Sequence, residues 1–452
     1  MTDQSTPSVR LKTAADESRG QELLAKANAN VERYRQGDAH IRFSGPSGKP
    51  LQGLEVEIVQ VSQDFLFGNL LFNLLKGDQA YKPDLFKQRF LELFNLGILP
   101  FAWANYERQP GITEAHSIMP ILEWCQSNRV TPKGYPLVWP FLGGIPEWLY
   151  DMPEGSVNAL TQERVVNIVK SFASNIHIWD VANEAVNHIS WKEATSREFH
   201  TQYLSASQVD GHPAGVNFRR EIPISEAADW VEESFRWAYS ANPQAILILN
   251  DYNQEISLNV RQRFFDLVRE LQRRKTPVSG LGLQVHTLNR WVWPDQIWNT
   301  LEMYSRLNVP IHITEMNQPS WEQAIVGGWR QGLWTETAQA EYVEQLYRLF
   351  FGHPSVVSIS YWGLSDRGNW VDRGGLVDAE YSPKPVFNVL KKLIKGEWLT
   401  GPLTTRTGMD GGVSWRGFFG QYEVTVRQPE KKDLIYQFHL SEKDANKWVI
   451  TL

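Results

Sequence analysis

The stretch Ile176-His-Ile-Trp-Asp-Val-Ala-Asn183 is a short, mostly apolar run that ends on a polar residue, and Glu184 follows it directly. Such a run is typical of a strand that is buried on both faces, as strands are in a parallel sheet. Further along the chain, Glu226 to Trp237 has the spacing of an amphipathic helix. Together these two elements predict a parallel sheet that is covered by helices.

The same alternation repeats along the chain from Phe65 onward, with helical spacing between short apolar runs. The runs are Phe65 to Phe72, Ile98 to Ala104, Pro132 to Trp139, Ile176 to Asn183, Ala245 to Asn250, Gly280 to His286, Pro310 to Met316 and Val356 to Trp362. Eight strand–helix units predict an α/β fold, namely a (β/α)₈ TIM barrel with some long loops. A doubly wound open sheet is the alternative, but it would need fewer units.

The two ends of the chain have a different pattern. The first residues are polar, with a helix expected over Ala15 to Arg35, and Leu54 to Val61 then alternates as a half-buried strand does. The tail has turn signals and alternating runs such as Gln421 to Arg427. The expected organisation is a polar segment with a helix over 1–38, a β-hairpin over 39–64, the barrel over 65–395 and a β-rich region over 396–452 that pairs with the hairpin.

The composition excludes several classes of protein. The 452 residues include 45 Lys and Arg against 51 Asp and Glu, a net charge of −6 that argues against a nucleic-acid partner. One cysteine excludes an internal disulfide framework and a cysteine-based zinc site. No apolar run approaches the roughly 18 residues of a membrane span, and no signal peptide is visible. The unusual feature is the number of tryptophans, 19.

Polar residues stand where the apolar runs end, and in a barrel of this type function collects at those ends. Glu184 follows the fourth strand and Glu315 lies at the end of the seventh, so we expect the two carboxylates on facing sides of one rim. Most glutamates are solvated surface charges, but two at apolar strand ends are less easily explained that way. A carboxylate pair is what glycoside hydrolysis requires.

Four ordered segments resemble the signatures of family 10 glycoside hydrolases, which are mostly retaining endo-β-1,4-xylanases on a (β/α)₈ barrel. The resemblance runs from about Phe65 to Leu393. The segments are Trp179-Asp-Val-Ala-Asn-Glu-Ala185, Gly280-Leu-Gly-Leu-Gln-Val-His286, Ile313-Thr-Glu-Met316 and Trp362-Gly-Leu-Ser-Asp-Arg-Gly-Asn-Trp370.

The resemblance implies roles for individual residues. Glu184 would be the acid/base and Glu315 the nucleophile of a double displacement. Asn183 would hold the sugar 2-hydroxyl, Gln284 would approach the acid/base, and His286 would bond to the nucleophile. The other residues implied to contact substrate are Trp139, Tyr135, Trp362, Trp103, Trp370 and Asn317. We expect His312 to be a buried core histidine, and we expect no catalytic metal and no cofactor.

The departures from the family pattern concern sugar recognition more than bond cleavage. Where the family usually carries a Glu-Asn pair and a Lys on strand two, this chain has Ile98, Leu99 and Ala102. The usual Gly-His on strand three becomes Gly134-Tyr135, and the usual Asp after the nucleophile is Asn317. We therefore expect altered binding of the sugars on the non-reducing side.

These observations predict a monomeric β-1,4-glycanase that acts on a polysaccharide or oligosaccharide, xylan first, without a nucleic-acid or membrane partner. The alternatives are a retaining barrel glycosidase for another β-glycan or β-glycoside, and a non-catalytic carbohydrate-binding protein. The tryptophans of two long loops either extend the sugar cleft or pin the loops down: Trp291, Trp293, Trp321, Trp329 and Trp334. The location is expected to be cytoplasmic as the chain stands, or extracellular if it has been trimmed.

Overall fold

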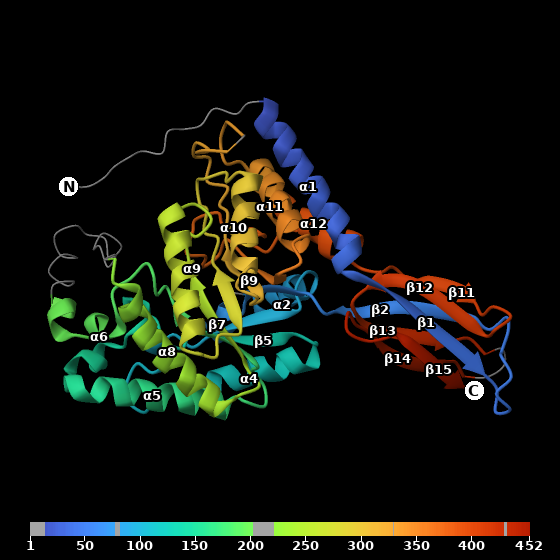
Figure 1. Ribbon diagram of the computed structural model, residues 1–452, viewed down its shortest axis with the longest axis horizontal. Coiled ribbons are helices and arrows are strands. Elements are labelled where there is room, and N and C mark those ends of the chain that lie inside the picture. Colours follow the sequence, from blue (N-terminus) through green and yellow to red (C-terminus); the bar gives the residue numbers. More distant parts are fainter. Residues whose placement is uncertain (1–13, 77–81, 202–220, 329, 429–431) are drawn as a thin grey trace.

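The computed structural model of the chain contains a barrel and a β-sandwich that lie beside each other (Figure 1). It describes residues 14–76, 82–201, 221–328, 330–428 and 432–452. Strands from both ends of the chain build the sandwich, and the barrel lies between them in sequence. No helix within these ranges has the length and hydropathy of a membrane span.

The barrel is a closed, parallel sheet in which consecutive strands are neighbours and the last strand pairs with the first. Its strands are β3 (Leu66–Leu70), β4 (Leu96–Pro100), β5 (Thr131–Tyr135), β6 (Ile178–Asn183), β7 (Ile246–Asp251), β8 (Gly280–Leu283), β9 (Ile311–Met316) and β10 (Val356–Tyr361). The predicted (β/α)₈ barrel is confirmed, because the eight predicted runs supply these eight strands.

The helices cover the outer face of the barrel (Figure 1). They are α1 (Ala14–Tyr34), α2 (Pro83–Leu91), α3 (Trp103–Tyr106), α4 (Ala115–Ser127), α5 (Glu154–Ser171), α6 (Trp191–Ala194), α8 (Ile224–Ala241), α9 (Leu258–Arg273), α10 (Pro294–Ser305), α11 (Glu336–Phe351) and α12 (Pro385–Lys392). In α9, Phe264, Leu267 and Leu271 recur at helical spacing and are buried, and Ser257 caps the first turn by accepting a hydrogen bond from the Val260 N–H at 3.3 Å.

The sandwich consists of two sheets with the strand orders β12-β1-β15 and β11-β2-β13-β14. Its strands are β1 (Gln36–Ser44), β2 (Glu55–Gln63), β11 (Leu403–Arg406), β12 (Gly412–Phe418), β13 (Gly420–Val426), β14 (Leu434–Leu440) and β15 (Lys447–Thr451). Alternate residues of both sheets, such as Ile41, Ile58 and Val424, form a separate hydrophobic core between them.

The predicted hairpin over residues 39–64 is wrong, because β1 and β2 do not pair with each other. β1 pairs with β12 and β15, whereas β2 pairs with β11 and β13. The connection between β1 and β2 crosses from one sheet to the other, so the two strands face each other across the sandwich core. Alternation along a strand shows that one face is buried, but not which strand lies alongside.

The sandwich lies at the end of the barrel where the strands begin. Arg35, between α1 and β1, donates hydrogen bonds to the carbonyls of Phe351, His353 and Val356 at 2.8, 2.7 and 2.7 Å, and these residues precede or begin β10. The guanidinium also lies 4.8 Å from the centre of the Phe65 ring. The half-buried Arg35 guanidinium thus joins the terminal region to the base of the barrel.

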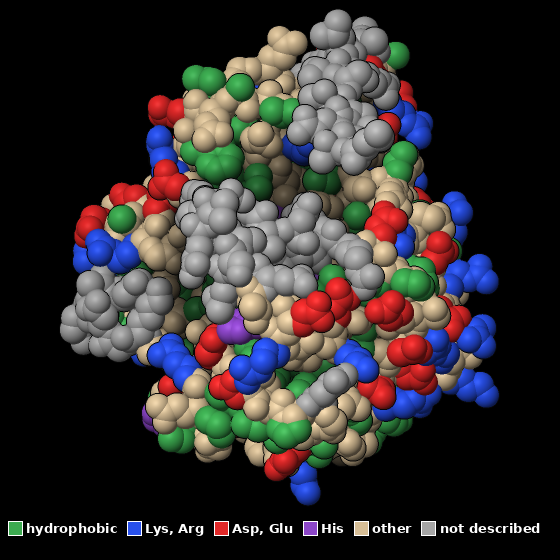
Figure 2. Space-filling view, turned by 90° about the vertical axis from the view of Figure 1, so that its left-hand side faces the viewer, with side chains coloured by type: hydrophobic (Ala, Val, Ile, Leu, Met, Phe, Trp, Pro, Cys, Tyr) green, Lys and Arg blue, Asp and Glu red, His purple; other side chains and the backbone are tan. Residues whose placement is uncertain are grey.

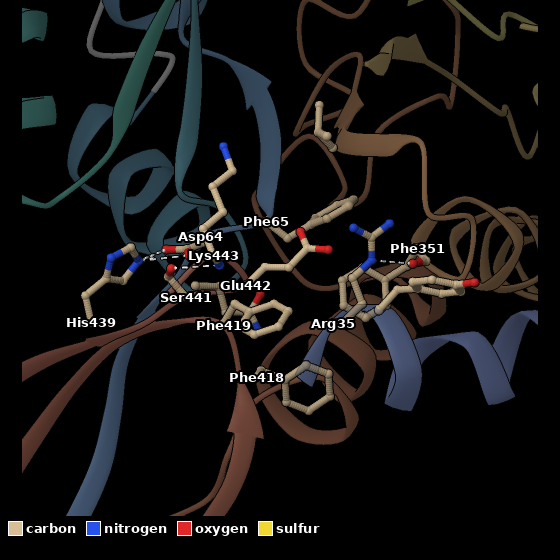
Figure 3. A pocket seen from close by; sticks show the side chains of 13 residues that line it. Arg35, Asp64, Phe65, Phe351, Phe418, Phe419, His439, Ser441, Glu442 and Lys443 are labelled. Atoms are coloured by element: carbon tan, nitrogen blue, oxygen red, sulfur yellow. Dashed lines mark hydrogen bonds and ion pairs between the residues drawn. The ribbon is translucent and has the colours of Figure 1, made fainter. Parts of the chain in front are cut away.

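A cavity of about 340 Å³ lies at this junction (Figure 3). Phe65 and Val357 line it from the barrel, and Phe418, Phe419 and His439 line it from the sandwich. Figure 3 shows Arg35 and the His439–Asp64 ion pair on different sides of this space. The cavity is therefore at the opposite end of the barrel from the carboxyl ends of the strands.

The barrel interior changes from apolar to polar along the strands. Near its base, Leu96, Ile178 and Ile248 form a small hydrophobic cluster. Above them lies an ion pair between Lys133 Nζ and Asp180 Oδ2, at 2.8 Å, whose side chains are 3% and 1% exposed. Burial raises the pKa of Asp180 to about 6 despite the charge of Lys133.

Five strands, β3, β4, β5, β8 and β10, end earlier than the apolar runs predicted, and β4 and β8 illustrate the reason. β4 ends at Pro100, and Trp103 begins the short helix α3. β8 ends at Leu283, and Val285 adopts a left-handed conformation with φ 59°. In both cases apolar residues continue past the strand because the rim of the barrel is itself buried by loops.

Replacement of Arg35 by Met should lower the free energy of unfolding by about 3 kcal/mol, because three buried carbonyls lose a charged donor. Chemical denaturation of the purified protein measures this change. Arg33→Met, at an exposed position in the last turn of the preceding helix α1, is the matched control and should leave the midpoint nearly unchanged. Equal midpoints for the two variants would contradict the anchoring role of Arg35.

Replacement of Lys133 by Met should lower the free energy of unfolding at neutral pH by about 3–5 kcal/mol, because it strands the Asp180 carboxylate without a partner. The raised pKa of Asp180 in the folded state means that the folded protein binds the proton more readily than the unfolded one. Without Lys133 the pKa of Asp180 lies higher still, so the loss should shrink as the pH falls toward about 6 and stay constant below it, where Asp180 is protonated in both proteins. Denaturation curves across this range measure it.

The double variant Lys133→Met/Asp180→Asn is the control, since it removes both charges together. It should regain most of the lost stability and lose the pH dependence. A double variant no more stable than Lys133→Met would show that packing of the lysine stem, rather than the ion pair, is what matters.

Candidate active site

The carboxyl ends of the barrel strands lie at the end of the barrel away from the sandwich. Figure 2 shows the molecule from that side, and the surface is hollowed in its upper half, with hydrophobic side chains in the hollow. Glu184 directly follows β6 and Glu315 lies on β9, so both are at this end of the barrel, and they are 8% and 3% exposed. β7 and β8 separate their two strands around the barrel.

Glu184 sits in the first turn after β6. All of Ile178–Asn183 is buried, which fixes the end of the strand. Glu184 itself has φ 62°, an uncommon left-handed conformation for a residue with a side chain. Its N–H donates to the carbonyl of Asn250 on β7 at 2.7 Å. The turn is therefore held by the neighbouring strand, and it directs the carboxylate into the barrel mouth.

Three donors surround the Glu184 carboxylate. Trp139 Nε1 lies 2.8 Å and His188 Nε2 lies 2.6 Å from Oε2, and Gln284 Nε2 donates to Oε1 at 3.0 Å. Burial alone would raise the pKa of Glu184, but the bonds from His188, Gln284 and Trp139 and the charge of His188 outweigh it. The pKa of this carboxyl therefore lies below its ordinary value.

Glu315 has a different environment, one residue before the end of β9. Asn250 Nδ2 donates to its Oε1 at 2.7 Å, and His286 Nε2 lies 3.3 Å from its Oε2. Burial raises its pKa above the ordinary value, the bonds from His286 and Asn250 oppose the rise, and the charge of Glu184 adds to it. The surroundings therefore lower the pKa of Glu184 and raise the pKa of Glu315.

A chain of side-chain amides connects the two carboxylates. Gln284 Nε2 bonds to both Glu184 and Asn183 Oδ1, the latter at 3.3 Å. Asn250 Nδ2 bonds to both Asn183 Oδ1, at 2.8 Å, and Glu315. The Asn250 amide fits because β8 has a glycine beside it: a Cβ at Gly282 would lie 2.3 Å from Asn250 Oδ1. The amides hold both carboxylates in one fixed arrangement.

Aromatic rings line the space beside these carboxylates. The Tyr135 ring lies 4.9 Å from Trp362 in an edge-to-face arrangement, and Trp370 lies 5.0 Å from His286 in a similar one. Tyr135 also joins the amide network, because its hydroxyl lies 3.3 Å from Asn183 Nδ2. Trp362 is 8% exposed and Trp370 is 57% exposed, so Trp370 presents a free ring face at the rim.

Two of the residues predicted to contact substrate, Trp103 and Asn317, are engaged by other parts of the protein. Trp103 is 2% exposed and packs against Trp191 and the Arg164 guanidinium, so it supports the rim from behind. Asn317 is fully buried, and its Nδ2 donates to the Trp362 carbonyl at 2.5 Å. A residue at a strand end faces either the cleft or the surrounding loops, and spacing in the sequence does not distinguish the two.

The structure also shows which of the loop tryptophans are buried. Trp291 and Trp334 are buried and stack on each other at 5.5 Å, so they pin the loops after β8 and β9. Trp293 and Trp321 are half-buried. Trp329 lies outside the described residues. His312 is a buried core histidine, as predicted: its Nδ1 lies 2.8 Å from Ser358 Oγ, and burial lowers its pKa to about 3.

Three residues of this site were missed by reasoning from the sequence. His188 bonds to Glu184, Asn250 bridges Asn183 and Glu315, and Asp251 accepts bonds from the Val186 N–H at 2.9 Å and from Asn187 Nδ2. Asn250 and Asp251 end the fifth apolar run, so their position was visible. His188 carries no such signal, because only the fold of the turn after Glu184 brings its ring back to the carboxylate.

Across the described ranges, no three His, Cys, Asp or Glu side chains are placed so that they could hold a metal ion. The site offers two carboxyl groups whose pKa values are shifted in opposite directions, held by amides and imidazoles beside exposed aromatic surface. Such a pair can protonate one atom and attack or deprotonate at another.

Known proteins are similar to this chain over most of its length. Endo-1,4-beta-xylanase B of Thermotoga neapolitana is 26% identical over 61% of this chain and 72% of its own. Endo-1,4-beta-xylanase 1 of Arabidopsis thaliana is 22% identical over 93% of this chain, which spans only 39% of that longer protein. The crystal structure of xylanase 10B from Thermotoga petrophila superposes with a TM-score of 0.58 at 22% identity, covering 74% of this chain and 95% of that one, and so supports the barrel fold.

The family assignment follows from a direct match. The model of glycosyl hydrolase family 10 matches residues 101–393, well over half of the chain. The matched segment contains both glutamates and the amides that join them, and the fold is the one that the solved family 10 structures share. The chain therefore belongs to glycosyl hydrolase family 10.

Proposed function

We propose that this protein is a retaining glycoside hydrolase that cleaves β-1,4-linked glycan, with xylan or xylo-oligosaccharides as its first substrate. The observation that carries the proposal is the pair of buried carboxylates, Glu184 and Glu315, joined by Asn183, Gln284 and Asn250 in one hydrogen-bonded arrangement. Two carboxyl groups on facing strands are the machinery of a double displacement.

In the proposed reaction, Glu315 attacks the anomeric carbon while Glu184 delivers a proton to the leaving oxygen. The bond between the anomeric carbon and that oxygen breaks, and its electron pair stays on the oxygen. A glycosyl ester on Glu315 results. Glu184, now a carboxylate, takes a proton from water, and the water oxygen displaces Glu315 from the anomeric carbon. Two inversions at one carbon give net retention.

Surrounding residues are assigned from their contacts with the pair. In the proposal Asn183 holds the sugar 2-hydroxyl, as the family resemblance implies, and this bond strengthens in the transition state. Gln284 orients Glu184, and His286 orients Glu315. Trp139, Tyr135, Trp362 and Trp370 offer ring faces or edges on which the apolar faces of a sugar can pack.

The choice of xylan rests on the relatives, whose names describe endo-1,4-beta-xylanases. Binding on the non-reducing side is expected to be weaker than is usual in the family. Ile98 and Leu99 are buried apolar residues where charged or amide groups would otherwise bind a sugar. Each charge-assisted hydrogen bond lost is worth about 1.5–3 kcal/mol. Tyr135 offers a hydroxyl in partial compensation.

Glu184→Gln and Glu315→Gln should each lower the rate of glycan hydrolysis by at least about 100-fold, because each removes a proton donor or a nucleophile. Reducing-end assays on xylan, with the fold checked by circular dichroism, measure the loss. Glu123→Gln, on the exposed face of α4, is the matched control and should keep full activity. Substantial turnover by either site variant would contradict the proposed roles of the two glutamates.

The two roles can be separated with a substrate whose leaving group needs no proton. On 2,4-dinitrophenyl β-xylobioside, Glu184→Gln should still form the glycosyl ester, and added azide should trap it as the β-glycosyl azide. Glu315→Gln should form no ester. The reverse result would exchange the two assignments, and ester formation by both variants would contradict them.

The first-formed product of the wild-type protein should be the β-anomer, because two displacements restore the original configuration. Proton NMR of the product before mutarotation measures this directly. A screen over xylan, mixed-linkage glucan and mannan should give the fastest release of products from xylan. An α-anomer would contradict the retaining mechanism, and a faster rate on another glycan would replace the substrate.

A further inference from the structure

His188 makes the shortest of the bonds to Glu184. Its Nε2 lies 2.6 Å from Glu184 Oε2, and its backbone N–H donates to the Glu184 carbonyl at 3.2 Å. The residue follows Glu184 by one helical turn, so the two side chains lie on the same side of the backbone. The contact is built into the local fold of the chain and does not depend on a distant loop.

The imidazole is enclosed on both sides. Its ring lies 5.5 Å from the Phe141 ring and 6.0 Å from the Tyr252 ring, and the residue is 5% exposed. Asp251 fixes the turn beneath it by accepting bonds from the Val186 N–H and from Asn187. Held in this way, Nε2 has a fixed direction toward the Glu184 carboxylate.

The two imidazoles of the site are not equivalent. His286 lies 3.3 Å from Glu315, whereas His188 lies 2.6 Å from Glu184. Asn317 lies next to His286 in the rim; its side chain is neutral, and its Nδ2 donates to the Trp362 carbonyl. The close imidazole–carboxylate pair therefore belongs to the proposed acid/base and not to the nucleophile.

This arrangement raises a chemical problem for the proposed function. A carboxylate that accepts bonds from Trp139, His188 and Gln284 is stabilised as an anion, and its pKa lies below the ordinary value. A carboxylate must bind a proton before it can protonate a leaving oxygen, and the 2.6 Å contact brings His188 Nε2 to where that proton can pass between the two groups.

We propose that His188 is a positioning residue that stores this proton, so that Glu184 and His188 act together as the acid and the base of the reaction. The inference rests on the proposed function. In the first step, His188 Nε2 passes its proton to the Glu184 carboxylate as that group protonates the leaving oxygen, and the imidazolium becomes neutral imidazole. In the second step, the proton lost by the attacking water returns through Glu184 to Nε2.

Other ionisable groups face the pair from the neighbouring strands. Glu315 on β9 and Asp251 on β7 act on Glu184 through their charges, and Tyr135 on β5 is held neutral because burial and both glutamates raise its pKa. Burial raises the pKa of Asp251 to about 7, so it too can titrate near neutrality. Asp251 is a carboxyl, whose ionisation responds little to temperature, whereas that of an imidazole responds strongly.

The test is His188→Gln, whose side-chain amide can still donate to Glu184 but cannot ionise. In the wild type, Glu184 and His188 share one proton and keep it to a higher pH than Glu184 would alone. The apparent pKa of the basic limb of kcat/KM should therefore fall by about one unit or more in the variant. In the wild type that limb should move with temperature as an imidazole does. In His188→Gln it should be nearly insensitive to temperature, as for a carboxyl. His177→Gln, exposed at the other end of β6, is the matched control.

A second readout separates proton supply from packing. His188→Gln should turn over xylan more slowly but form the glycosyl ester from 2,4-dinitrophenyl β-xylobioside at the wild-type rate, because that leaving group needs no proton. An unchanged basic limb with the wild-type temperature dependence would overturn the proposal. So would an equal loss on both substrates, which would show that His188 only maintains the shape of the site.

The outcomes also distinguish this inference from the function on which it rests. If Glu184→Gln and Glu315→Gln are inactive on xylan while His188→Gln has the wild-type pH profile, the proposed function stands and the role of His188 falls. If Glu184→Gln hydrolyses xylan normally, the proposed function is wrong, and so is the proposed role of His188.

Discussion

Two carboxylates that are buried in one barrel mouth repel each other and have lost most of their water, so the protein must supply hydrogen-bond donors for both. The polar network of the rim meets this constraint. Asn250 serves Glu315 and Asn183 together, Gln284 serves Asn183 and Glu184 together, and each glutamate has its own histidine. Because most members bond to two others, moving any one of them disturbs both carboxylates.

The supports of this network extend outward through the fold. β8 carries a glycine where the Asn250 amide needs space, the turn after β6 accepts a left-handed residue at Glu184, and the Asp251 carboxylate fixes the turn that carries His188. None of these features improves the packing of the barrel. Each makes sense as a means of aiming a polar group at the mouth, which is where strained and buried polar residues are expected in an enzyme.

The barrel and the two glutamates could be predicted from the sequence because both depend on local patterns: apolar runs of strand length, and a polar residue where each run ends. What could not be predicted depends on which way a side chain turns once the fold has formed. Trp103 and Asn317 occupy strand ends but face the supporting loops, and His188 lies in a loop but faces Glu184. The hairpin of β1 with β2 was wrongly predicted for a related reason, since alternation does not identify a partner strand.

The pairing of the sandwich has a consequence for the order of folding. Within the described residues, β1 pairs with β12 and β15, and β2 pairs with β11 and β13, so Ile41 must wait for Val413 and Trp448 to be synthesised. All barrel strands, from β3 to β10, are synthesised before these partners, so the sandwich can close only after the whole barrel segment has been made. Since the entropy of closing a loop grows only slowly with its length, a barrel that has already folded makes this closure shorter and less costly than an unfolded chain would.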